Sequence, residues 1–278
     1  MSYGDILVYL PLPRSSELVE ASVKLAKEFG AHLTAISSLP ITAMLRDAVQ
    51  NPFIRLEEAG EVEKAIRGEA EQAEEAERHF DAVSKRAGVS HEWEMGEGDP
   101  GDVLIYASRL QDLIILEQCG EASELLHGPV VQVVLSGHPA LVVPRACTSL
   151  LPVTHAVIAW NGSAQASAAV RQALPFLTRA GRVSLLRGRP RETRPGSWRV
   201  PPLDIEAYLR RHGIEAETVE FDPPDAEAGP NILTFAEGAK ADLIVMGAFG
   251  RSRFKEWVLG GATRLVLERM TTPVFMVH

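Results

Sequence analysis

Glycines in the last quarter of the chain have a spacing that suits the binding of an anion. The pattern is G-x-x-G-x9-G-G-x-T, and it is formed by Gly247, Gly250, Gly260, Gly261 and Thr263. Glycine lets bare backbone approach a phosphate, and a helix that starts in glycine offers free N–H groups and the positive end of its dipole. The pattern therefore predicts phosphate binding. The alternative, glycines that only make tight turns, explains one G-x-x-G better than two glycine clusters.

Positive charge surrounds this pattern, and other chemistries have less support. Four cationic residues lie in or beside it: Arg251, Arg253, Lys255 and Arg264. The pattern is neither a Walker loop nor a G-x-G-x-x-G dinucleotide loop. The eight histidines are scattered without metal-ligand spacing, so we expect surface or capping roles and no metal site. No G-x-S-x-G elbow is present, and Ser163 has no evident base, so we expect no catalytic residue.

The elements that must position these glycines occur twice in the chain. Apolar runs with little alternation, each separated by a helical pattern, indicate parallel strands that are buried on both faces. The matching runs are residues 5–12 and 155–160, 32–37 and 182–186, 112–116 and 242–246, and 139–143 and 273–277. The sequence therefore predicts an α/β fold of two tandem doubly wound domains. Each would hold a five-stranded parallel sheet with helices on both faces. We place the domains at residues 1–147 and 153–278, with a proline-containing linker at 144–154.

Helical spacing predicts the segments that cover these sheets. In the first copy they are residues 15–29 and 103–110, and in the second copy 164–178, 203–212 and 232–240. Residues 56–86 form a longer, strongly charged helix. We expect it to lie across the sheet as a solvated amphipathic helix, and the alternative is a partner-binding helix. Its expected inward positions are Val62, Ile66, Ala70, Ala73, Ala76, Phe80 and Val83.

The charge of the chain differs between the two copies. The net charge is −9, which argues against nucleic acid and anionic membranes as partners. Residues 1–148 hold 12 basic and 24 acidic side chains, a net of −12, so residues 149–278 carry a net of +3. The two cysteines, Cys119 and Cys147, fit a reducing cytoplasm. Neither a signal peptide nor a membrane span is expected.

The stretch of residues 242–278, which contains the glycine pattern, resembles the C-terminal half of a universal stress protein domain of the nucleotide-binding class. That family has the signature G-x2-G-x9-G followed by Ser or Thr. Because the resemblance covers both copies, the chain resembles a tandem universal stress protein. The resemblance implies an adenine nucleotide alpha hydrolase-like fold that binds ATP at the carboxyl ends of the strands. ADP or AMP is the alternative ligand, and Mg2+ would accompany the phosphates.

The resemblance also implies a set of site residues. Backbone N–H groups of the glycines and of Ala262 would cradle the phosphates and ribose, Thr263 would add a hydroxyl, and Met246 would lie near the sugar. The adenine and ribose would lie at the end of the first strand of this copy. The implied set is Ala159, Trp160, Asn161, Ser163, Met246, Gly247, Gly250, Arg251, Gly260, Gly261, Ala262 and Thr263. Two alternatives stay open: the Trp160 ring stacks on a base or packs in the core, and residues 161–163 form only a turn and helix cap.

Departures from the family pattern separate the two copies. Asn161 stands where the family has Asp, and Gly261 where it has Ser or Thr, so we expect binding to survive with altered affinity. The first copy lacks G-x-x-G after its 112–116 run, and Pro129 follows Gly128 and removes a backbone donor. We expect the first domain not to bind ATP and to act as a structural or regulatory partner.

The expected function is regulatory ATP binding in a stress response, with little or no hydrolysis. The alternative is a scaffold that acts through the acidic first domain, and a slow ATPase ranks last. In this family the last strands of two domains commonly pair antiparallel. Residues 141–143 and 274–277 could pair in this way within one chain and form an internal pseudo-dimer. A further homodimer of whole chains is left open.

Overall fold

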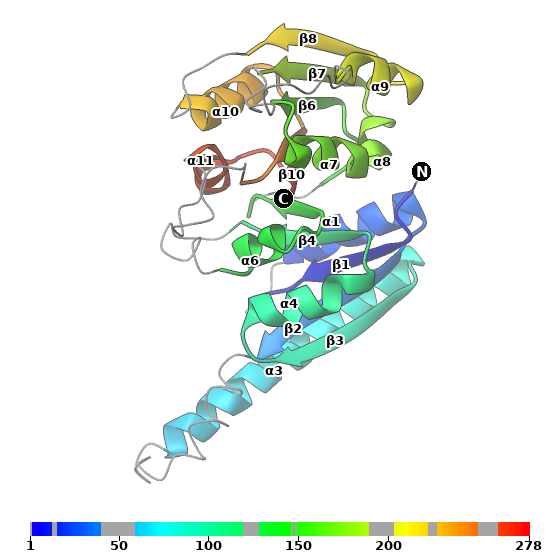
Figure 1. Cartoon of the computed structure of the whole chain (residues 1–278). Coiled ribbons are helices and arrows are strands. Elements are labelled where there is room, and N and C mark those ends of the chain that lie inside the picture. The colour runs from blue at the N-terminus through cyan, green and yellow to red at the C-terminus, as the bar shows by residue number, and fades with distance from the viewer. Residues whose placement is uncertain are drawn as a thin grey trace.

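The structure of the chain is a computed structural model with side chains. It describes residues 2–12, 16–39, 59–118, 128–145, 147, 149–188, 203–221, 227–249 and 261–278, with backbone alone for 59–63. Ten strands in these ranges form one sheet in the order β3-β2-β1-β4-β5-β10-β9-β6-β7-β8 (Figure 1). The strands are β1 (Asp5–Tyr9), β2 (His32–Leu39), β3 (His91–Glu97), β4 (Leu113–Glu117), β5 (Ala140–Val143), β6 (His155–Trp160), β7 (Arg182–Arg187), β8 (Ala216–Glu220), β9 (Leu243–Gly247) and β10 (Val274–Val277).

Helices cover both faces of this sheet. The helices are α1 (Ser16–Phe29), α3 (Ala59–Ala87), α4 (Pro100–Ala107), α6 (Pro129–Leu135), α7 (Ala164–Gln172), α8 (Leu174–Leu177), α9 (Ile205–Arg211), α10 (Ala228–Gly238) and α11 (Gly261–Arg269), with a 3-10 turn η1 (Ser108–Leu110). One buried core contains residues of α1, α3, α7, α8 and α9, and a second core contains residues of α4, α6, α10 and α11. The predicted α/β class, with doubly wound parallel strands, is confirmed.

The sheet consists of two parallel halves that meet in one antiparallel pair. β1 to β5 pair in parallel with one another, and so do β6 to β10. At the seam β10 runs antiparallel to β5, with Val274 opposite Val142 and Phe275 opposite Leu141. The predicted pairing of the last strands within one chain is therefore confirmed. Because the pair is antiparallel, the carboxyl edge of one half lies beside the amino edge of the other.

Aromatic side chains from both halves meet beside the seam. The ring of Phe29 lies 5.1 Å from that of Tyr3 and 5.3 Å from that of Phe176, between ring centroids. Phe176 also contacts Phe275 of β10 at 6.1 Å. The Tyr3 hydroxyl donates to the carbonyl of Gln172 at 2.7 Å. The seam therefore has a shared hydrophobic core as well as a strand pair.

The two halves begin their first strands in the same way. In the first half, the N–H groups of Gly4 and Asp5 donate to Oδ2 of Asp112 at 2.6 and 3.2 Å. In the second half, the N–H groups of Thr154 and His155 donate to Oδ2 of Asp242 at 2.7 and 3.0 Å. Each aspartate immediately precedes the strand that neighbours the first, so it fixes the register of the two strands at the amino edge.

The outermost strands, β3 and β8, are absent from the sequence-based assignment. β3 has the sequence HEWEMGE and β8 the sequence AETVE, and both are largely exposed or half-buried. Each lies at one end of the sheet and carries several glutamates. An edge strand needs no continuous apolar run, so the pattern that identifies the inner strands does not find it.

Two helices differ from their predicted course. The expected helix 164–178 is broken into α7 and α8, because Pro175 cannot donate an N–H within a continuous helix. The long helix α3 packs through Ala73, Ala76, Phe80 and Val83, but its first end projects past the sheet (Figure 1). Its expected inward residue Ala70 is exposed. Glu69, four residues before Ala73, is 7% exposed in its place.

None of the helices in the described ranges combines the length and apolar character needed to cross a membrane.

Candidate functional site

The predicted site residues that the structure describes gather at the carboxyl edge of the second half. β6 and β9 are neighbours there, with Ala159 opposite Met246 in the parallel register. The two strands lead into the segments that begin at Asn161 and Ala248. The sheet therefore brings together two segments that lie nearly ninety residues apart. Gly250, Arg251 and Gly260 lie outside the described residues, as do Arg253 and Lys255.

Asn161 and Ser163 form the turn that starts α7. The N–H of Ser163 donates to Oδ1 of Asn161 at 3.1 Å, and Gly162 between them has a φ of +75°. The Ser163 hydroxyl then accepts the N–H of Ala166 at 3.1 Å, so Ser163 is the helix N-cap. The predicted turn and cap are confirmed. A contact of Asn161 or Ser163 with a nucleotide stays a prediction.

Trp160 packs in the core at the end of β6. The residue is 8% exposed, and it belongs to the core that also contains Ile158 and Val183. Its carbonyl accepts the N–H of Gly188 at 2.7 Å. The structure thus supports the core-packing alternative for the ring, and base stacking by the ring is not favoured.

Gly247 is required by close packing inside the protein. A Cβ placed on it would lie 2.4 Å from the backbone N of Ala166 and 2.7 Å from the carbonyl carbon of Gln165. These are backbone atoms at the start of α7, which cannot rotate away. Gly247 therefore lets the end of β9 pass directly beneath the first turn of α7.

Ala248 and Phe249 continue from β9 into the glycine-rich loop. The N–H of Ala248 donates to the carbonyl of Val277 at 2.8 Å, and Nδ1 of His278 donates to the carbonyl of Ala248 at 3.1 Å. Phe249 has a φ of +50°, a left-handed conformation that is uncommon for a bulky residue. Strained backbone of this kind persists where surrounding contacts hold it, and it is frequent at ligand sites. The neighbours of Ala248 supply such contacts.

The second described part of the glycine motif forms the start of α11. A Cβ on Gly261 would meet no heavy atom of the described residues within 4 Å, and this first residue of α11 is exposed. Thr263 is 4% exposed, and its hydroxyl accepts the N–H of Phe249 at 3.3 Å. Ala262 contacts α10, where a Cβ on Gly229 would lie 2.8 Å from the Ala262 carbonyl oxygen. The helix start is thus fixed to both the loop after β9 and the neighbouring helix.

One expected contributor of positive charge is already paired. Nε of Arg264 donates to Oε1 of Glu268 at 2.6 Å, an i,i+4 ion pair along α11. Arg264 does lie beside the motif, and Glu268 offsets its positive charge locally. The N–H groups and the helix dipole are the features of this end of α11 that would favour an anion.

The geometry just described agrees with the family model that matches this part of the chain. Residues 153–278 match the model of the Universal stress protein family. The second half of the chain is therefore similar to the universal stress protein family, and we call it the universal stress protein half. No curated protein matches the chain.

Solved structures extend the likeness of fold over the whole chain. A universal stress protein from Archaeoglobus fulgidus DSM 4304 is similar with a TM-score of 0.70 and 20% identity, covering 97% of this chain and 94% of that one. A protein of unknown function from Pseudomonas aeruginosa PAO1 is similar with a TM-score of 0.59 and 12% identity, covering 98% and 92%. At such identities these structures show a shared fold.

The first half has a different carboxyl edge from that of the universal stress protein half. At the end of β4, Glu117 and Gln118 stand where the second half has Gly247 and Ala248. α6 begins after the N-cap Gly128, which has no side-chain cap, and Pro129 occupies its first turn. The missing N–H of Pro129 leaves this helix start with one donor fewer for an anion. The amide of Gln118 is directed across the seam to α11.

A buried histidine in the universal stress protein half was missed by sequence analysis. His155 is 6% exposed. Its Nδ1 donates to the carbonyl of Ala239 at the end of α10, at 3.0 Å, so Nε2 accepts the hydroxyl of Ser184 at 2.9 Å. The ring joins β6, β7 and α10, which corrects the expectation of a surface position and leaves the capping role. A pocket of about 360 Å³ lies beside it, with Arg182 and Glu217 also in its lining.

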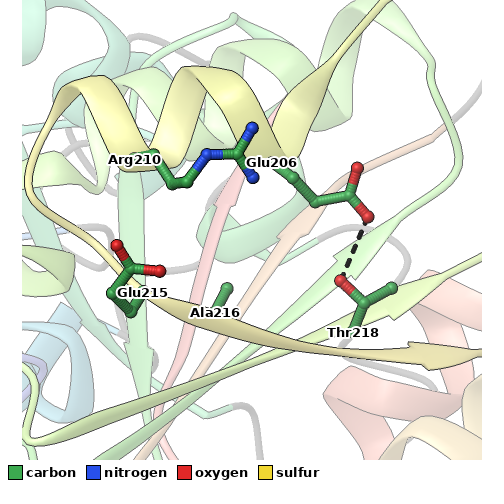
Figure 2. Close-up of a pocket in the computed structure, with 5 residues that line it drawn as sticks. All are labelled: Glu206, Arg210, Glu215, Ala216 and Thr218. Atoms are coloured by element: carbon green, nitrogen blue, oxygen red, sulfur yellow. Dashed lines mark hydrogen bonds between the residues drawn. The ribbon is translucent and has the colours of Figure 1, made fainter.

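A second pocket lies between α9 and β8 (Figure 2). It has a volume of about 250 Å³ and is lined by Glu206, Arg210, Glu215, Ala216 and Thr218. The Thr218 hydroxyl donates to Oε1 of Glu206 at 3.1 Å, and Nη1 of Arg187 donates to the same oxygen at 2.9 Å. Neither this pocket nor the one beside His155 contains a predicted site residue. Among the described residues, no group of three or more His, Cys, Asp or Glu side chains is placed to hold a metal ion.

Proposed function

We propose that the universal stress protein half binds an adenine nucleotide, with ATP as the ligand, at the carboxyl edge of its sheet. The observation that carries the proposal is the start of α11, where Gly261 is exposed and Thr263 ties the helix to the loop after β9. A nine-residue helix with a bare first residue fits a phosphate, because its free N–H groups and dipole both attract an anion. Gly261, Ala262 and Thr263 would hold the phosphates, with Mg2+ as their counter-ion. Gly250, Arg251 and Gly260 join them in the proposal through the sequence pattern alone.

The sugar and base belong on the other side of the same edge. Ala159 and Met246 lie in adjacent strands there, and Asn161 follows immediately. Oδ1 of Asn161 already accepts the N–H of Ser163, so the side-chain amide N–H groups of Asn161 are its natural contribution to a ligand. The backbone after β6 and β9 would supply the remaining polar contacts.

The proposed role is regulatory, within a stress response, with little or no hydrolysis. The described residues that we place around the ligand contribute amide, hydroxyl and backbone N–H groups, which bind and orient a phosphate but are poor general bases. We also propose that the first half binds no nucleotide, because Pro129 and Glu117 occupy its corresponding positions. A cytoplasmic location belongs to the same proposal and rests on the low cysteine content.

The decisive variant is Gly261→Asp. A carboxylate at the first residue of α11 meets no described heavy atom near its Cβ, and the helix dipole stabilises its negative charge. The free energy of unfolding should therefore stay the same or rise by up to about 1 kcal/mol. The same carboxylate would face the phosphates, so ATP affinity should fall about tenfold or more, measured by calorimetry. The matched control is Gly128→Asp at the N-cap of α6, which should leave affinity unchanged.

Titration of the wild-type protein with ATP tests whether the chain binds the nucleotide at all. We expect one ATP per chain and a rise in melting temperature with ATP concentration. A Gly261→Asp protein that binds ATP as tightly as the wild type would place the site elsewhere. A wild-type protein without any ATP-dependent stabilisation would favour the scaffold alternative. One observation supports that alternative: α3 projects past the sheet and exposes Glu71, Glu74 and Glu75.

A further inference from the structure

Helix α11 connects the proposed nucleotide edge with the seam between the two halves. Its first residue, Gly261, lies at the carboxyl edge of the second half, and its last turn lies beside the seam. At nine residues the helix is about 13 Å long. α11 and α6 lie on opposite sides of the seam in Figure 1. Any residue that holds the last turn of α11 therefore acts on the same rigid element whose first turn would bind phosphate.

Gln118 of the first half holds that last turn. Its Nε2 donates to the carbonyl of Leu267 at 2.8 Å and to the carbonyl of Glu268 at 3.3 Å. Its own backbone is fixed, because its N–H donates to the carbonyl of Val143 in β5 at 2.8 Å. The contact crosses from one half of the chain to the other. Carbonyls in the last turn of a helix have no partner within the helix, so an outside donor there stabilises the helix end.

At the end of the corresponding helix of the first half, no side chain of the second half donates a hydrogen bond among the described residues. α6 is closed by its own next residues. The N–H of Ser136 donates to the carbonyls of Gln132 and Val133, the Ser136 hydroxyl donates to Val133 at 2.5 Å, and the N–H of Gly137 donates to Val134. The counterpart of Gln118 on that side is Ala248, which has no side-chain donor. Among the described residues, the cross-seam cap is thus present on one side only, on the helix of the proposed site.

We propose that Gln118 is a positioning residue for the nucleotide site and that the first half regulates nucleotide affinity through it. This inference rests on the proposed function. The Gln118 amide fixes the last turn of α11, and the Phe249–Thr263 hydrogen bond and the contact with Gly229 fix its first turns. Loss of the amide frees one end of a short rigid helix and so misplaces the N–H groups at the other end. Coupling of this kind is reciprocal, so bound nucleotide should also strengthen the seam.

The test compares ATP affinity and apo stability in matched variants of the full chain. Gln118→Met keeps the length of the side chain and removes the donor, and we expect ATP to bind about three- to tenfold more weakly. Gln118→Lys restores a donor suited to a helix C-terminus and should bind within about twofold of the wild type. Ser136→Ala removes a comparable cap from α6 and should lower the melting temperature without any change in ATP affinity.

The ATP affinity of the variants shows whether Gln118 positions the nucleotide site or only stabilises the fold. A Gln118→Met protein that melts earlier but binds ATP as the wild type does would overturn the inference while leaving the proposed function in place. A wild-type protein that binds no ATP would overturn both. If Gln118→Met does not fold, Gln118→Glu carries the same test, because it keeps the shape and turns a carboxylate toward the α11 carbonyls. Its affinity for ATP should be at least as weak, and unchanged affinity would again overturn the inference.

Discussion

The backbone N–H of Phe249 donates to the hydroxyl of Thr263, at 3.3 Å, and so joins the two clusters of the glycine motif. Phe249 is held in a left-handed conformation, and Thr263 is buried in the first turn of α11. The bond thus connects the loop after β9 to the helix start that we propose to bind phosphate. It explains why a hydroxyl residue closes the G-x-x-G-x9-G-G-x-T pattern.

Thr263→Val should therefore reduce both stability and binding. The change keeps the shape of the side chain and leaves the N–H of Phe249 without its acceptor, so the free energy of unfolding should fall by about 1–2 kcal/mol. ATP affinity should also fall, because the loop loses its attachment to α11. Thr263→Ser keeps the hydroxyl and should retain the affinity of the wild type. Urea unfolding and calorimetry measure the two effects, and equal ATP affinity in Thr263→Val and wild type would contradict the proposed link.

Two glycines of the same motif should respond in opposite ways to alanine. Gly247→Ala forces a Cβ to 2.4 Å from the backbone of α7, so we expect a loss of about 1–3 kcal/mol in the free energy of unfolding. Gly261→Ala adds a Cβ at an exposed helical position with no described heavy atom within 4 Å, so stability should stay the same or rise by up to about 1 kcal/mol. Denaturant midpoints of the two variants test this directly. Equal tolerance of both changes would mean that α7 moves away from β9 readily.

Tyr3 should make the protein sensitive to alkaline pH. Burial raises the pKa of its phenol well above 10, the negative charge of Asp112 raises it further, and Arg179 opposes this. The unfolded chain therefore releases this proton first. The contribution of Tyr3 to stability is complete below pH 10 and is lost as the pH rises toward the folded pKa, by about 1.4 kcal/mol per pH unit.

The matched variant for this prediction is Tyr3→Phe. It loses the hydrogen bond to the Gln172 carbonyl, so it should be less stable than the wild type at pH 8 by about 1 kcal/mol. Between pH 10 and 11 its stability should fall less steeply than that of the wild type. Free energies of unfolding measured at both pH values separate the effects. Parallel pH profiles of the two proteins would show that Tyr3 ionises without unfolding the seam.

Lys240 offers a stabilising substitution at the end of α10. It has a φ of +51°, whereas glycine occupies the left-handed position after α1, α3 and α9, at Gly30, Gly88 and Gly213. Lys240→Gly should raise the free energy of unfolding by about 1 kcal/mol, because glycine adopts this conformation without steric cost. Lys240→Ala removes the same charge and keeps the strain, so it should give no such gain. A thermal scan of the three proteins distinguishes these outcomes.

Local sequence signals predicted the features that depend on near neighbours. The buried inner strands and the N-cap at Ser163 both follow from patterns within a few residues. Even the antiparallel pairing of β5 and β10 was predicted, from a family resemblance. The edge strands β3 and β8 escaped because their glutamates interrupt any apolar run.

Features that depend on distant residues could not be predicted in the same way. Glycine is needed at position 247 because α7, about eighty residues earlier in the chain, packs against it. The side chain of Gln118 donates to a carbonyl 149 residues later in the chain. The glycine motif pointed to one site, but only the fold separates Gly247, which relieves crowding, from Gly261, which is exposed. The same holds for His155, whose burial depends on Ser184 and Ala239.

The distribution of glutamates on the outermost strands determines how far this sheet can grow. The join between β5 and β10 uses the two strand edges that are apolar and buried. The remaining free edges carry Glu92, Glu94 and Glu97 on β3, and Glu217 and Glu220 on β8. An approaching copy would bring carboxylates against carboxylates at β3, which opposes strand pairing, whereas Glu217 and Glu220 of β8 are paired with Arg182 and Arg187 of β7. The acidic margin at β3 therefore disfavours growth of the ten-stranded sheet at that end.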